Sequence, residues 1–92
     1  KYLSDAKDFL VKLINMFKEI VIKHVMERVP QDRSIQASIL MYSPEFLEKI
    51  RSLVRRIIFE NEKYDERIIV NLLHKEAKNL GESIVTQFRV SR

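Results

Sequence analysis

Apolar residues recur with the period of an α-helix, and this pattern restricts the fold more than any other feature of the chain. In the last third they follow at steps of four, four, three, four and four residues: Ile69, Leu73, Ala77, Leu80, Ile84 and Phe88. A helix turns about 100° per residue, so these side chains share one face. With one Gly and two Pro among 92 residues, turns must be few and helices long.

Four helices are expected, over residues 5–28, 32–42, 44–60 and 66–89. Ser4 and Asp65 are suitable N-caps for the first and last helices, because their oxygen atoms can accept a hydrogen bond from a free backbone N–H. The third helix has the clearest start, since Ser43 can cap it and Pro44 fits the first helical position. Together these elements predict an all-α fold.

One segment is ambiguous between helix and strand. Read as an alternating strand, residues 35–42 place Ile35, Ala37, Ile39 and Met41 on one side. Read as a short helix, the same residues present Ile35, Ile39 and Tyr42 on one face. We favour the helix and keep the strand as an alternative.

Three long amphipathic helices and one short helix, joined by short connections, predict a compact antiparallel bundle of about four helices. We expect residues 1–92 to form a single domain, which can bury one core without disulfides. The first residue is Lys1 rather than Met, so we expect the domain to be part of a longer protein. The predicted core faces are Ala6, Phe9, Leu10, Leu13, Phe17, Ile20 and Val21 in the first helix, and Phe46, Leu47, Ile50, Leu53, Val54, Ile57 and Ile58 in the third.

Composition excludes several classes of site. The absence of Cys removes disulfides, thiolate zinc sites and cysteine nucleophiles. No stretch has the ~18 consecutive apolar residues of a spanning helix, and there is no signal peptide, so we expect an intracellular protein of cytoplasm or nucleus. The net charge of +4 is too small to indicate polyanion binding alone, because acidic residues are interleaved with basic ones.

The sequence contains no constellation typical of an enzyme. His24 and His74 are the only histidines, and no Gly-rich loop or nucleophile elbow is present. His24 lies on the apolar face near the end of the first helix, where we expect it to be partly buried and hydrogen-bonded. We therefore predict no catalytic residue, no metal and no cofactor.

Residues 73–90 suggest one nucleic-acid alternative. Ala77 followed four residues later by Gly81, with Leu80 between them, resembles the helix-turn-helix DNA-binding motif. That resemblance implies a turn at Gly81 and base contacts from four residues of the second helix: Ser83, Thr86, Gln87 and Arg89. A single straight helix explains the same spacing, because the apolar phase continues through Gly81.

The strongest candidate for a binding residue is Phe59, which lies on the face of the third helix that should be soluble. This face also carries Lys49, Arg51, Ser52, Arg55 and Arg56. The helix could end before residue 59, the first helix could cover Phe59, or it could be one exposed apolar residue of no special role. The functional interpretation is an aromatic anchor framed by arginines, since both residue types are enriched in binding hot spots.

The first helix has a second apolar stripe outside its core face. Val11, Ile22 and Met26 fall on this side, with Asn15 and Lys18 between them. Another helix of the bundle could cover the stripe, or a second chain could contact it.

We therefore expect a protein–protein interaction module, such as a regulatory domain, that docks a partner segment or forms a homodimer. The alternative is nucleic-acid binding through the basic face of residues 44–60 or through the degenerate helix-turn-helix at 73–90.

Overall fold

The computed structural model describes the backbone of residues 2–90 and the side chains of residues 7–89, and it confirms the all-α prediction. Helix α1 spans Tyr2–Arg28, α2 spans Ser34–Met41, α3 spans Pro44–Glu60 and α4 spans Glu66–Val90. A 3₁₀ turn, η1, at Gln31–Arg33 precedes α2. Residues 35–42 contain no strand, so the strand alternative is wrong.

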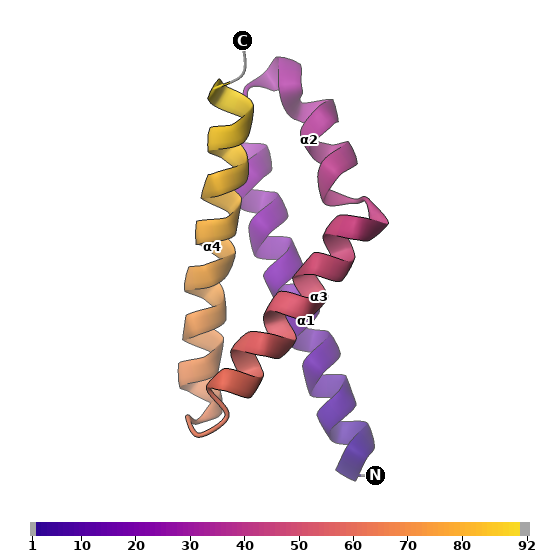
Figure 1. Cartoon of the computed structure of the whole chain (residues 1–92), viewed down its shortest axis with the longest axis vertical. Coiled ribbons are helices and arrows are strands. Elements are labelled where there is room, and N and C mark those ends of the chain that lie inside the picture. The colour runs from indigo at the N-terminus through magenta and orange to yellow at the C-terminus, as the bar shows by residue number, and fades with distance from the viewer. Residues whose placement is uncertain (1, 91–92) are drawn as a thin grey trace.

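The helices form an elongated bundle of 49 × 22 × 17 Å with three legs (Figure 1). The first leg is α1, the second combines α2 and α3, and the third is α4. Consecutive legs run in opposite directions, so α1 and α4 run in the same direction and pack along each other. Helix α3 crosses α1 on one side of this pair, and α2 packs against the second half of α1.

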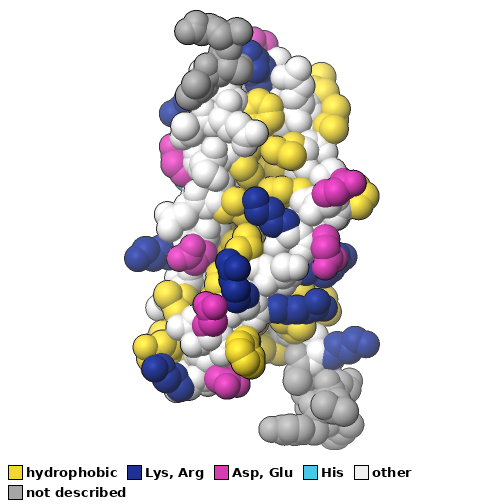
Figure 2. Space-filling model, in the orientation of Figure 1, with side chains coloured by type: hydrophobic (Ala, Val, Ile, Leu, Met, Phe, Trp, Pro, Cys, Tyr) yellow, Lys and Arg dark blue, Asp and Glu magenta, His cyan; other side chains and the backbone are white. Residues whose placement is uncertain are grey.

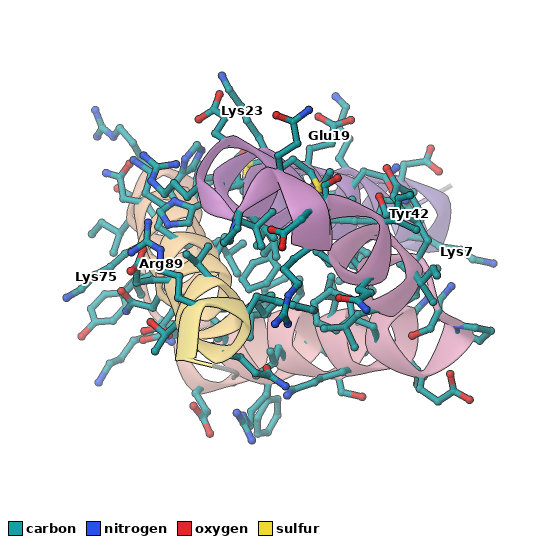
Figure 3. The ribbon with its side chains drawn as sticks, turned by 90° about the horizontal axis from the view of Figure 1, so that it is seen from above. Lys7, Glu19, Lys23, Tyr42, Lys75 and Arg89 are labelled. Atoms are coloured by element: carbon teal, nitrogen blue, oxygen red, sulfur yellow. The ribbon has the colours of Figure 1, made fainter. Side chains whose placement is uncertain are left out.

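The core lies where α1, α3 and α4 meet. Phe17, Val21 and Val25 of α1 are fully buried, and α2 contributes Ala37 and Met41. Apolar side chains fill the space between the helices when the molecule is viewed along its long axis (Figure 3). No polar or charged side chain is buried among the residues whose side chains are described. The remaining buried apolar residues are Leu13, Val29, Phe46, Ile50, Val54, Ile69, Leu73, Ala77, Ile84 and Val85.

Two of the three predicted N-caps are confirmed. The Phe46 N–H donates to Ser43 Oγ at 3.2 Å, and the Ile68 N–H donates to Asp65 Oδ1 at 3.1 Å. The Ser4 prediction is wrong because α1 already begins at Tyr2 and continues through Ser4. A serine inside a helix costs only a few tenths of a kcal/mol, so it does not force a start there. The predicted core residue Ala6 lies outside the residues whose side chains are described.

The helix-turn-helix interpretation of residues 73–90 is also wrong. Helix α4 passes through Gly81 without a break, as the apolar phase indicated. A Cβ added at Gly81 would lie 3.0 Å from Cβ and Cδ2 of His24. The glycine therefore permits close packing of α1 on α4 and does not make a turn.

Candidate docking surfaces

The outer face of α3 carries the first predicted surface, here called the α3 face: Lys49, Arg51, Ser52, Arg55, Arg56 and Phe59. All six residues are exposed, and Phe59 is 73% exposed. Buried Phe46, Ile50 and Val54 fix the opposite side of α3 against the core, so the strong amphipathic pattern of this helix holds the α3 face in solvent. Figure 2 shows Lys and Arg side chains over α3, with apolar side chains visible between them.

Few acidic side chains neutralise the α3 face. Arg51 Nη1 lies 3.0 Å from Glu48 Oε1, one helical turn away. Among the described residues, no ion pair involves Lys49, Arg55 or Arg56. Phe59 is therefore an exposed aromatic ring on the same turns of helix as two arginines without acidic partners.

A cleft of about 220 Å³ lies between α1 and α3. It connects Val11, Asn15 and Lys18 of the second predicted surface to Arg51 of the α3 face. Ile14, Leu47 and Ile50 give it an apolar lining, and Lys18 and Arg51 add positive charge. Val11 and Asn15 complete its wall on α1. Arg51 lies about 12 Å along α3 from Phe59, so the cleft and the α3 face are continuous.

The structure separates the remaining residues of the second surface from this cleft. Ile22 is half-buried and packs against the core. Met26 is 39% exposed and lies about 22 Å along α1 from Val11. The five predicted residues therefore do not form one patch.

Helix α2 presents an exposed apolar face that we did not predict as a site, here called the α2 face. Ile35, Ile39 and Tyr42 are 75%, 67% and 58% exposed, because α2 packs on the core through Ala37 and Met41. Tyr42 points away from the bundle in Figure 3. The helical spacing of these residues was visible in the sequence, but it indicated only that they share a face and not which way that face points.

The third feature is a contact between α1 and α4 near their carboxyl ends. His24 Nε2 lies 2.9 Å from Glu82 Oε1, and the His24 side chain is 15% exposed. This confirms that His24 is partly buried and hydrogen-bonded. The hydrogen bond from His24 lowers the pKa of Glu82 below its ordinary value, and the charges of His24, Arg89 and Arg28 act in the same direction.

These surfaces receive no assignment from metal ligands, membrane spans or known proteins. Within the described residues, no group of three His, Cys, Asp or Glu side chains could hold a metal ion. None of the described helices is long and apolar enough to cross a membrane. No family model, curated protein or solved structure matches the chain.

Proposed function

We propose that this domain binds an acidic amphipathic helix of a partner protein on the α3 face. The observation that carries the proposal is the exposure of Phe59 beside Arg55 and Arg56, which no acidic side chain of the described residues neutralises. A partner helix with apolar residues on one side and carboxylates at its edges complements this face in both respects.

The energetics favour Phe59 as the anchor. Complete burial of a Phe side chain contributes about 2 kcal/mol, which is about 30-fold in affinity. Arginine suits the surrounding positions because its planar guanidinium can hold a carboxylate through two hydrogen bonds. The cleft at the Arg51 end offers the same partner a second place to insert an apolar side chain.

The charges of α3 favour a protein over a nucleic acid. Its exposed basic residues, Lys49, Arg51, Arg55 and Arg56, are accompanied by exposed Glu45, Glu48 and Glu60. A phosphate backbone is negative along its whole length and would meet these carboxylates with repulsion, whereas a partner helix can place its carboxylates beside Arg55 and Arg56 and away from the three glutamates.

A synthetic helical peptide with leucines on one face and glutamates at its edges provides the test, with fluorescence anisotropy as the readout. We expect Phe59→Ala to weaken peptide binding about 30-fold and Arg55→Glu/Arg56→Glu to weaken it at least tenfold. Ile39→Ala is the matched control for an exposed apolar residue, and Lys12→Glu is the control for charge.

Two results would contradict this proposal. One is equal peptide binding by wild type, Phe59→Ala and Ile39→Ala. The other is tighter binding to random duplex DNA than to the peptide, with an affinity that falls steeply between low and moderate salt.

Self-association is a second candidate function, supported by the α2 face. Residues 34–44 contain no charged side chain, although the chain carries a net charge of +4. A second copy can therefore pack its own α2 face here in a symmetric pair without like charges meeting, which is not true of the α3 face.

We expect a weak dimer that Ile39→Glu abolishes in sedimentation equilibrium, whereas Met26→Glu leaves it intact. Identical monomeric behaviour of wild type and Ile39→Glu at high concentration would exclude it.

A further inference from the structure

A second cleft, of about 350 Å³, lies between α1 and α4 and is separate from the α3 face. Ile20, Lys23, His24, Glu27 and Arg28 line it from α1, and His74 and Lys78 line it from α4. Lys23 projects from α1 on the side away from α3 in Figure 3. No histidine is visible on the face shown in Figure 2, where α3 lies in front. The volume falls in the range of small-molecule sites.

Positive charge dominates this cleft. Lys23, Arg28 and Lys78 converge on it from two helices, and Glu27 is its one acidic lining residue. Arg28 Nη1 lies 3.4 Å from Glu27 Oε1, so this carboxylate already has a cationic partner. Among the described residues, no ion pair involves Lys23 or Lys78. Both histidines of the chain line the same cleft, and the ring of His24 is hydrogen-bonded to Glu82.

The wall that contains His24 is fixed by packing. The imidazole lies against Gly81, where an added Cβ would be 3.0 Å from Cβ and Cδ2 of His24. Glu82 accepts a hydrogen bond from the same ring and leaves it little freedom to turn. Gly81 therefore lets α4 approach His24 closely beside the cleft.

We propose that the cleft between α1 and α4 binds a small soluble molecule that carries a phosphate group. Lys23 and Lys78 match the negative charge of a phosphate without competing ion pairs. Arg28 shares its charge with Glu27, and its Nη1 also donates to the His24 carbonyl oxygen, so its remaining N–H groups are the ones that can donate to phosphate oxygens. Ile20 supplies an apolar wall for the organic part of the molecule. Because the cations line a concave space between two helices, a free phosphate compound reaches them more readily than a flat membrane surface does.

The two histidines provide a direct readout, because both line the cleft and the chain has no others. Inorganic phosphate is titrated into the protein at constant pH and ionic strength, and the ring proton signals of the histidines are followed by NMR. We expect both signals to shift and to reach saturation. Replacing phosphate by chloride at matched ionic strength should give no saturating shift.

Charge-removing variants connect the shift to the cleft. Lys23→Gln/Lys78→Gln should weaken phosphate binding at least tenfold, since it removes two of the three cations, while Lys49→Gln on α3 should leave it unchanged. All three substituted positions, Lys23, Lys78 and Lys49, are exposed, so the variants should fold normally.

Three outcomes would overturn the proposal: shifts that never saturate, wild-type affinity in Lys23→Gln/Lys78→Gln, or equal weakening by Lys49→Gln. Vesicles containing phosphatidic acid distinguish the source of the phosphate. Binding to these vesicles without binding to inorganic phosphate would assign the same cations to a membrane surface and reject a soluble ligand.

Discussion

Gly81 shows at the residue scale how the absence of a side chain lets two helices pack closely. An alanine here would raise helix propensity by about 1 kcal/mol, but its Cβ would meet the His24 ring at 3.0 Å. Because His24 is held by Glu82 and packed between α1 and α4, the ring has little room to move aside. The steric cost should therefore exceed the gain in propensity.

We predict that Gly81→Ala lowers the free energy of unfolding by about 1 to 2 kcal/mol, measured by urea denaturation. The same substitution in a His24→Gly background should be neutral or stabilising, because this background lacks both Cβ and the ring of His24 and only the gain in propensity remains. Equal destabilisation in both backgrounds would show that His24 is not the obstacle.

Glu82 leads to a prediction about pH. The hydrogen bond from His24 lowers the pKa of Glu82 in the folded protein. Ionised Glu82 therefore stabilises the fold above its unfolded pKa near 4.5, and this contribution is lost as the pH falls through its folded pKa. Glu82→Gln should therefore be less stable than wild type at pH 6, and the difference should shrink as the pH is lowered below about 4.5. Thermal unfolding at several pH values measures this difference, and a constant difference across the range would rule out the assigned cause.

At the scale of elements, Ser43 connects α2 to α3. Its hydroxyl donates to the Leu40 carbonyl oxygen at 2.8 Å and accepts from the Phe46 N–H at 3.2 Å. We predict that Ser43→Ala lowers the free energy of unfolding by about 1 kcal/mol through loss of the cap. Ser52→Ala, in the exposed middle of α3, should change it by less than about 0.5 kcal/mol in denaturant titrations. Equal effects of the two substitutions would contradict a capping role.

The helices differ in how far their sequences predicted them. The bounds of α3 were predicted correctly because Ser43 and Pro44 mark its start and its two faces differ sharply in polarity. The α2 face was not predicted as a surface because residues 34–44 have no charged side chain to mark the solvent side. The cleft between α1 and α4 depends on contacts between helices that are distant in sequence, such as the contact of His24 with Glu82. The periodicity of one helix carries no information about such contacts.

At the scale of the whole molecule, the bundle exposes more surface than a compact monomer of its size. Its accessible surface is 6696 Å², whereas about 5,600 Å² is typical for a chain of 11.0 kDa. The radius of gyration is 14.4 Å, against about 12 Å for a compact domain of this length. A thin bundle of this shape leaves helix faces without partners, among them the basic α3 face with Phe59 and the apolar α2 face.

Binding on the α3 face requires that Phe59 contributes nothing to the fold and is available to a partner. The free energy of unfolding of Phe59→Asp, measured in urea beside Phe17→Ala, tests it most directly. We predict a change of less than about 0.5 kcal/mol for Phe59→Asp and a loss of about 3 to 5 kcal/mol for the buried Phe17. A loss above about 2 kcal/mol for Phe59→Asp would place this side chain in the core and contradict the account.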